Sequence, residues 1–292
     1  MNRLVKMLKL RRPEFTADDV VDAFKEYCIR YSLFSFAATM VERLKERGHQ
    51  RTAETYVTAI NSFRRFMGGC DIMLDCVDRE VILNYESFLL NKGVTLNTVS
   101  FYMRILRAVY NRAVECDAVE DIHPFRHAYT GVEKTSKRAI AISKVRYINR
   151  LDLSSLPALE YARDMFMMSF YLRGMSFVDM SFLKKTDLHN GYICYRRRKT
   201  GHMLRVAWTT EMQSILEKYP ANPNDYLLPI ITRSTVNVRS AYRNINYCIN
   251  RNLKKVGRMV GLDVPLTMYV ARHSWASAAH AKGCLLYTSP SP

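Results

Sequence analysis

The chain has 292 residues, of which 48% are hydrophobic and 24% are charged, and its formal net charge is +17. That length suffices for two ordinary domains, and the composition is typical of a soluble globular protein. A bilayer span needs a run of about 18 apolar residues, and a secretory signal needs an apolar segment before a small-residue cleavage site. The sequence contains neither, so we expect a cytoplasmic protein without a membrane segment.

The basic excess is concentrated in the second part of the chain. Residues 1–133 hold 19 Lys and Arg against 18 Asp and Glu, whereas residues 134–292 hold 25 against 9. A local excess of this size predicts a polyanionic partner, most often nucleic acid, although a basic surface can also serve solubility alone. The seven cysteines are scattered, without a CxxC pair or zinc-like spacing, which predicts reduced thiols and neither a metal nor another cofactor.

The first part of the chain has the pattern of a helical bundle. Apolar residues recur every three or four positions in four segments, and short loops separate these segments. Gly93, after the third segment, suits the left-handed conformation that ends many helices. We expect a tail at 1–14 and a helical domain at 15–115, with helices over 15–47, 52–67, 78–90 and 95–114.

A different pattern follows a predicted linker at 116–138, which contains Pro124, Gly131 and a polar tail. The second domain, at 139–283, should contain a buried helix, a β-hairpin, a long helix with one basic face and a last helix that Thr267 can cap. The fold class is therefore mainly α with a small β-hairpin (α+β). The four elements are expected over 156–172, 191–208, 238–260 and 268–282.

Two residues of the second domain could act on a phosphate. Arg173 directly follows the buried helix, and a guanidinium among apolar residues is costly unless it meets an anion. Capping of a helix end, or pairing with Asp164 or Asp179, is the structural alternative. Lys199 stands at the hairpin tip, where it could donate a proton to a leaving oxygen or be an ordinary solvated turn residue.

A third candidate lies at the start of the last helix. Tyr269 and Arg272 are three positions apart and therefore share one face, where the helix N-terminus favours a phosphate. The alternative is that Tyr269 is a core aromatic residue and Arg272 a surface ion-pair partner.

Taken together, the order Arg173, Lys199, Arg272 resembles the shared site of the tyrosine recombinase (phage integrase) family. In that family an arginine, a lysine on a β-hairpin and a His-x-x-Arg segment precede a nucleophilic tyrosine. The resemblance covers about residues 15–283. Within the family, the sequence is similar to the branch carried by conjugative elements and prophages. It is most specific in TAETYVTAINSF, NTVSFYMRILRAVYNRA, FYLRGMSFVDM, RRRKTG and YVARHSWAS.

The resemblance implies a site-specific recombinase that acts on double-stranded DNA as a homo-tetramer and needs no cofactor. In the family a tyrosine oxygen attacks the scissile phosphate, forms a 3′-phosphotyrosyl link and frees a 5′-hydroxyl. Arg173 and Arg272 would stabilise the charge on the non-bridging phosphate oxygens, and Lys199 would be the general acid. The helical domain would be the core-binding (SAM-like) domain, which grips the opposite face of the duplex.

Further DNA contacts are expected from both domains. Arg104, Arg107 and Asn111 share one face of the fourth helix, which could touch DNA or be a solvated face. Arg198 and His202 flank the lysine at the hairpin tip and are also expected to contact DNA.

The sequence departs from the family pattern in two places. Tyr269 stands where most members have histidine, and a phenol can donate a hydrogen bond but is a poorer base near neutral pH; His273 fills a supporting position. The chain also stops 20 residues after Arg272, and its last nine residues, CLLYTSPSP, match a translated frame of a sequencing-library adapter. We therefore expect a truncated, inactive copy with a non-native tail at 284–292, in which Tyr287 is not a nucleophile and no other one is present.

Other hypotheses stay open on the sequence alone. A DNA-binding protein that never cuts is separated from a recombinase by covalent trapping on DNA. A type IB topoisomerase shares the active-site logic and would relax supercoils without strand exchange. An RNA-binding protein is disfavoured, because the sequence has no aromatic RNA-reading motif.

Overall fold

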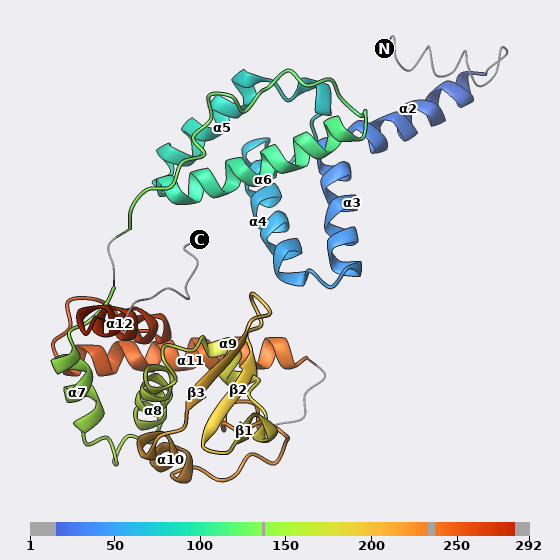
Figure 1. Cartoon of the computed structure of the whole chain (residues 1–292). Helices are drawn as coiled ribbons and strands as arrows, with labels where there is room; N and C mark the ends of the chain where they lie inside the picture. The colour runs from blue at the N-terminus through green and yellow to red at the C-terminus, as the bar shows by residue number, and fades with distance from the viewer. Residues whose placement is uncertain (1–15, 136–137, 233–236, 284–292) are drawn as a thin grey trace. The chain divides into compact units, whose positions relative to one another are not determined.

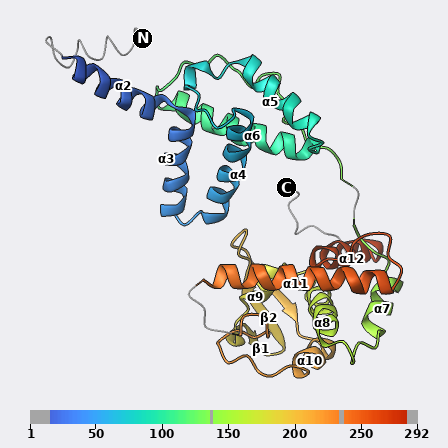
Figure 2. The same cartoon turned by 180° about the vertical axis from the view of Figure 1, so that it is seen from behind.

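The computed structural model describes residues 16–135, 138–232 and 237–283. The tails expected at 1–14 and 284–292, with Tyr287, lie outside the described residues. The chain divides into two compact units, Met1–Thr135 and Ser136–Pro292 (Figures 1 and 2). Each unit has a hydrophobic core of its own.

The regular elements described in the N-terminal unit are helices. Helices α3, α4 and α6 pack against one another, α5 packs on α4 and α6, and α2 packs on α3 (Figure 1). Phe63, Tyr85 and Met103 are fully buried between them. The elements are α2 (Ala17–Tyr31), α3 (Leu33–Glu46), α4 (Gln50–Phe66), the 3-10 turn η1 (Leu74–Cys76), α5 (Arg79–Asn91) and α6 (Leu96–Glu115).

The single helix expected over 15–47 is in fact two helices. The break falls at Ser32, which forms an isolated β-bridge with Met73. The Ser32 hydroxyl caps α3 by accepting a hydrogen bond from Ser35 N at 3.1 Å, and it donates to the carboxylate of Asp71. A partner almost forty residues away in the sequence therefore interrupts the helix, and helical periodicity does not reveal such a partner.

The segment expected as a linker at 116–138 packs largely onto the N-terminal core. Ala118, Val119, Phe125 and Ala128 are buried there. The Tyr110 hydroxyl of α6 donates a hydrogen bond to the carbonyl of Glu120 at 3.0 Å, which holds the start of the segment. The N-terminal unit therefore extends to Thr135, and proline, glycine and polar residues mark a loop that covers the domain.

The C-terminal unit is built around α8, which packs against α7, α10, α11 and α12 (Figures 1 and 2). The strands form one antiparallel sheet in the order β1-β2-β3, so the expected hairpin gains a short third strand. The predicted fold class, mainly α with a small β element, is confirmed. The elements are α7 (Ile142–Arg150), α8 (Pro157–Tyr171), α9 (Phe177–Ser181), η2 (Lys185–Asp187), β1 (Leu188–His189), β2 (Tyr192–Arg196), β3 (Met203–Ala207), α10 (Thr210–Glu217), α11 (Val238–Met259) and α12 (Met268–Ala281).

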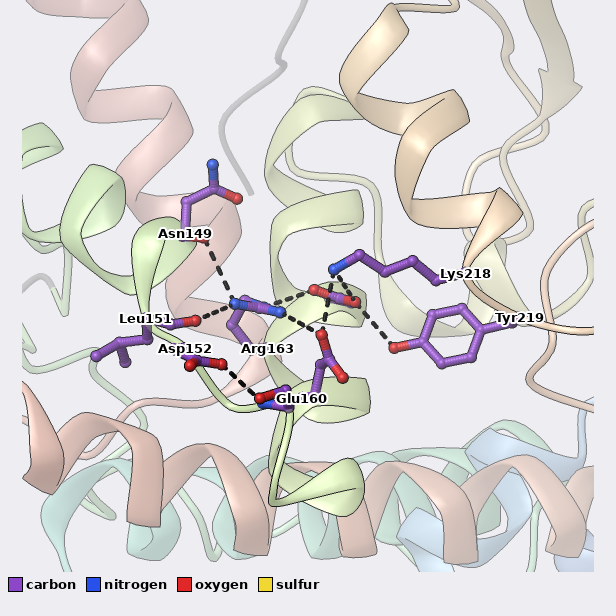
Figure 3. Close-up of polar contacts among 9 residues, drawn as sticks. Asn149, Leu151, Asp152, Glu160, Arg163, Lys218 and Tyr219 are labelled. Atoms are coloured by element: carbon purple, nitrogen blue, oxygen red, sulfur yellow. Dashed lines mark hydrogen bonds and ion pairs between the residues drawn. The ribbon is translucent and has the colours of Figure 1, made fainter.

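Helix α8 also carries a buried network of charges (Figure 3). Arg163 and Asp164 are 4% and 2% exposed, and they form an ion pair of 2.5 Å. Arg163 also pairs with Glu160 at 3.0 Å and donates to a carbonyl of the loop before α8 at 2.7 Å. Asp164 accepts from Lys218 Nζ at 3.1 Å and from the Tyr219 hydroxyl at 2.9 Å. The network therefore ties α8 to the loop after α7 and to the end of α10.

Among the residues that the structure describes, none of the helices combines the length and the apolar character that a bilayer span requires.

Candidate active site

Helix α8 ends in a Schellman motif that places Arg173 in a left-handed conformation. Arg173 N donates to Phe170 O at 3.1 Å and Gly174 N donates to Ser169 O at 2.8 Å, which satisfies the last carbonyls of the helix. The φ angle of Arg173 is 57°, at a position where glycine is the usual residue. The other described non-glycine residues with positive φ are of types that tolerate it, namely Asp117, His123 and Asn190. A strained arginine at this position points to a role for its side chain.

Gly174 brings the end of α8 into contact with α12. Its φ angle is 72°, and a Cβ atom at this position would meet Arg272 Cα at 2.8 Å, so only glycine fits. Arg272 Nε donates a hydrogen bond to Gly174 O at 2.6 Å. The structure therefore brings Arg272 against the residue that follows Arg173, although the two arginines are far apart in the sequence.

The start of α12, which positions Arg272, is fixed by α11. Thr267 occupies the N-cap position, as expected, but its side chain makes no capping hydrogen bond. Instead, Met268 N donates to Asn250 Oδ1 of α11 at 2.8 Å. Gly257 of α11 lies so close to Leu266 that an added Cβ would stand 2.9 Å from the leucine Cβ. The two helices are therefore joined tightly where α12 begins.

The β2–β3 hairpin is attached to the same region through Asp179 of α9. Ser176 caps α9: its hydroxyl accepts from Asp179 N at 3.3 Å and donates to Asp179 Oδ2 at 2.6 Å. The other oxygen, Oδ1, accepts from Arg198 N at 3.0 Å. Lys199 follows in the turn, is exposed, and makes no hydrogen bond or ion pair within the described part of the chain. The base of the turn is therefore held at the site, while the lysine extends from it.

The electrostatics around Arg272 reveal a residue that was not predicted, Arg197. Burial lowers the pKa of Arg272 first, and the positive charge of Arg197 lowers it further, against smaller opposing effects of Tyr195 and Asp179. Burial raises the pKa of Tyr195 to about 12, and the negative charge of Asp179 adds to that rise. Strand alternation could have found Arg197, because it follows buried Ile193 and Tyr195 at a spacing of two.

The remaining predicted residues surround this centre. Tyr269 lies one turn before Arg272, is 60% exposed, and packs edge-on against the ring of His273 at 4.4 Å. The guanidinium of Arg198 stacks over the Phe182 ring at 4.1 Å, and it is the Arg198 backbone that contacts α9. His202 is exposed, and its carbonyl accepts a hydrogen bond within the turn.

The structural alternatives for Arg173 are not realised as ion pairs. Asp164 is engaged by the buried network of α8, and Asp179 by Ser176 and the hairpin. Within the described ranges, no ion pair or hydrogen bond involves the Arg173 guanidinium. In those same ranges, no three His, Cys, Asp or Glu side chains are grouped so that they could hold a metal ion. The Arg173 side chain is exposed, and its backbone lies next to the contact between Gly174 and Arg272.

Comparison with known proteins identifies the fold. Residues 32–129 match the family described as the phage integrase SAM-like domain. The chain is similar in structure to a lambda integrase (residues 75–356) dimer bound to a COC′ core site. The TM-score is 0.67 and the identity 16%, and the match covers 88% of this chain and 96% of that chain. The chain therefore has the fold of this integrase.

Two further solved recombinases show the same fold. A lambda integrase tetramer bound to a Holliday junction gives a TM-score of 0.62 at 16% identity and covers 95% of this chain and 81% of that chain. The Tn1549 transposon integrase (residues 82–397) in complex with transposon right end DNA gives a TM-score of 0.60 at 15% identity. This match covers 86% of this chain and 87% of that chain. No curated protein matches the sequence.

Within this recombinase fold, the candidate DNA contacts of the SAM-like domain lie on α6. Arg104, Arg107 and Asn111 are all exposed, as their shared face predicts. Arg107 and Asn111 line a surface hollow together with the segment after α6, which adds Arg126, Asp121 and His123. His123 Nδ1 lies 2.8 Å from Asp121 Oδ2. The N-terminal unit thus presents basic and amide side chains on an exposed helix face beside this hollow.

Proposed function

We propose that the chain is part of a site-specific DNA recombinase (integrase) that acts on double-stranded DNA through a 3′-phosphotyrosyl intermediate. The observation that carries the proposal is the contact between Gly174 and Arg272, because it brings the backbone of Arg173 against the second arginine. The fold supports it, since the similar lambda and Tn1549 integrases are described in complex with DNA. As one of them is a dimer and one a tetramer, we propose that this chain also assembles on DNA.

In the proposed mechanism, Arg173 and Arg272 bind the non-bridging oxygens of the scissile phosphate. Negative charge grows on these oxygens in the transition state, and donors that are already oriented stabilise it without reorganisation. Arg272 is oriented by its bond to Gly174 O, and arginine stays charged near neutral pH. Each such donor is worth about 3–4 kcal/mol in comparable sites.

Lys199 and Tyr269 complete the proposed site. Lys199, in the hairpin turn, would donate a proton to the departing 5′-oxygen. The exposed Tyr269 hydroxyl, in place of the histidine usual in the family, would donate a hydrogen bond to the phosphate, and His273 would support it through the ring contact. Arg198 and His202 would contact the backbone of the same duplex.

DNA binding is the first test of the proposal. Fluorescence anisotropy with a duplex of arbitrary sequence should show binding that weakens steeply as salt is raised, because counterions are released from each neutralised phosphate. Replacing Arg104 and Arg107 by alanine should reduce the slope of log K against log salt by about 2, since each contact contributes about 0.9. A wild-type chain that does not bind duplex DNA would refute the proposed function.

Covalent capture separates a recombinase from a protein that binds without cutting. The chain is incubated with pooled duplex fragments and denatured in detergent, and protein-linked DNA is recovered and sequenced. Linked DNA that disappears in Arg173→Ala and Arg272→Ala supports strand transfer. Because no nucleophile is expected in this chain, binding without linked DNA is the expected result for it, and a version that carries the family's nucleophilic tyrosine is needed to separate the recombinase from the non-cutting protein. Supercoil relaxation without exchange favours a topoisomerase. A linkage that requires Tyr287 would contradict the sequence-based view of the 284–292 tail.

A further inference from the structure

We infer that Arg197 is a third arginine of the phosphate site and binds the same DNA phosphate as Arg272. The inference rests on the proposed function, and it adds a phosphate-binding residue to the arginine pair that the family resemblance indicates. It stands on four features of the C-terminal unit: the face of the strand, the anchoring of the turn, the proximity to Arg272 and the absence of a carboxylate partner.

The strand alternation directs Arg197 inward. Ile193 and Tyr195 are 0% and 7% exposed, and Arg197 is next on that face and half-buried, whereas Arg196 on the other face is exposed. The Arg197 backbone is held on both sides, because its N–H donates to His202 O and its carbonyl accepts from Gly201 N, each at 2.8 Å. These bonds fix the backbone of Arg197, and its planar guanidinium loses less entropy per hydrogen bond formed with an anion than a lysine side chain would.

A short chain of contacts connects Arg197 to Arg272. The next residue, Arg198, is bonded through its N–H to Asp179 at 3.0 Å. Asp179 belongs to α9, which begins three residues after Gly174, and Gly174 is in contact with Arg272. In agreement with this path, the charge of Arg197 is the second cause, after burial, of the lowered pKa of Arg272.

The positive charge at this place has no matching carboxylate. The oxygens of Asp179 accept from Ser176 Oγ and Arg198 N. In the described part of the chain, the Arg197 guanidinium forms no ion pair and no hydrogen bond. An arginine that only stabilises the fold is ordinarily paired, because an unpaired charge in a half-buried position is costly. Two neighbouring guanidinium groups and a single engaged carboxylate therefore form a site that a phosphate would neutralise.

The inference predicts opposite effects in the free and the bound protein. Without an anion, Arg197→Ala removes repulsion from Arg272, so the melting temperature of the C-terminal unit should stay the same or rise. With an anion, the variant lacks one charge-assisted hydrogen bond, so the dissociation constant should increase about tenfold or more. A residue with a merely structural role would lower the melting temperature with and without anion.

The test uses the full chain and inorganic phosphate as the probe. Thermal unfolding is followed by tryptophan fluorescence, which reports on the C-terminal unit alone because Trp208 and Trp275 both lie in it. Phosphate is titrated at constant ionic strength, and the dissociation constant follows from the rise in melting temperature. DNA binding is measured in parallel by anisotropy.

The variants are chosen to distinguish the effect of an arginine at position 197 from the general effect of one positive charge on the hairpin. Arg205→Gln is the matched control, because Arg205 lies on the other face of the same hairpin and stacks on Tyr192 at 3.7 Å. We expect Arg197→Ala and Arg272→Ala to weaken phosphate binding about tenfold or more, and Arg205→Gln to leave it unchanged. Arg197→Lys should restore part of the affinity, since it keeps the charge without the planar fork.

Three results would overturn the inference. In the first, Arg197→Ala binds phosphate like the wild type while Arg272→Ala does not. In the second, Arg197→Ala and Arg205→Gln weaken binding equally, which indicates a general effect of charge. In the third, the wild type binds DNA but not phosphate, so the inference fails and the proposed function stands. If the wild type binds neither phosphate nor DNA, both fail.

Discussion

The two units of the chain hold their charged residues in different ways. The N-terminal unit buries neutral polar groups, such as the Tyr85 hydroxyl bonded to Ser62 at 2.8 Å, and keeps Arg104 and Arg107 exposed on a regular helix. The C-terminal unit buries the Arg163–Asp164 pair and half-buries Arg272. Residues on a helix face can re-orient toward any duplex, whereas arginines fixed at element ends suit one phosphate. The proposed DNA-binding arginines of the N-terminal unit and the proposed catalytic arginines of the C-terminal unit therefore differ more in how firmly they are held than in their charge.

The largest difference in stability between the two units should come from substitutions in the buried ion network of α8. Asp164→Ala leaves Arg163 buried with fewer partners, so we expect the C-terminal unit to lose about 3–5 kcal/mol of unfolding free energy. Urea denaturation followed by tryptophan fluorescence measures this unit alone. Glu115→Ala, which removes the exposed partner of Arg112 in the N-terminal unit, should leave the stability measured by circular dichroism essentially unchanged. A loss of less than about 1 kcal/mol in Asp164→Ala would show that the network is not a tightly coupled one.

A pair of glycines tests the contact at the site. Gly174→Ala combines the left-handed strain with displacement of Arg272, so we expect a loss of about 3 kcal/mol and of phosphate binding. Gly93 has nearly the same φ, 71°, but no atom lies within 4 Å of an added Cβ. Gly93→Ala should therefore cost only the strain, about 1 kcal/mol. Equal losses for the two glycines would argue against the tight contact with Arg272.

High pH should weaken the C-terminal unit through Tyr195. Its pKa is raised from 10.0 to about 12 in the folded state, mainly by burial. The stabilisation from the neutral phenol is complete below pH 10 and is lost as the pH rises toward 12, which amounts to about 1 kcal/mol at pH 11. Tyr195→Phe should remove part of this decline in the tryptophan signal between pH 9 and 12. The rest should remain, because burial also raises the pKa values of Tyr161, Tyr171 and Tyr219 in the same unit. Tyr85→Phe acts on the other unit and should not change it.

The smallest predicted effect is a gain in stability, where the substitutions above predict a loss. Arg173→Gly relieves the left-handed strain at the end of α8, so the C-terminal unit should gain about 0.5–1 kcal/mol. The same variant should bind phosphate more weakly than the wild type. Asp117→Gly, at φ 55° in the N-terminal unit, should gain less, because aspartate tolerates this conformation better. Destabilisation by Arg173→Gly would mean that the side chain supports the fold instead.

Local patterns predicted most of the fold, and long-range contacts account for the rest. The periodic apolar residues predicted the helices from Gln50 onward within the N-terminal unit, and the strand-like pattern over 191–208 predicted the hairpin. The break at Ser32 depends on Asp71 and Met73, and nothing in the neighbouring sequence indicates these partners. The burial of Phe125 was missed for a similar reason, because a lone aromatic residue in a polar loop has no periodicity.

The candidate site was predicted mainly from the order of its residues in the resemblance, and the roles of Arg173, Lys199 and Arg272 stay predictions. The structure adds the contact through Gly174, which depends on two segments that meet only in the fold. Arg197 was hidden among three consecutive arginines, although a period of two along the strand distinguishes it from its neighbours. Charge alone did not single it out.

The bond between Arg198 N and Asp179 divides the hairpin into two parts. Arg197 lies before this anchor and shares the fixed geometry of the strand, while Lys199 lies beyond it, in a turn closed by the bonds of Gly201 to Arg197 O and to Arg196. A side chain that binds an anion binds it better when its position is fixed. A side chain that donates a proton must be able to move to the oxygen that accepts it. Arg197 and Lys199, only two residues apart, can therefore serve phosphate binding and proton donation, respectively. The hydrogen bond of the Arg198 amide between them is what gives the two side chains different freedom to move.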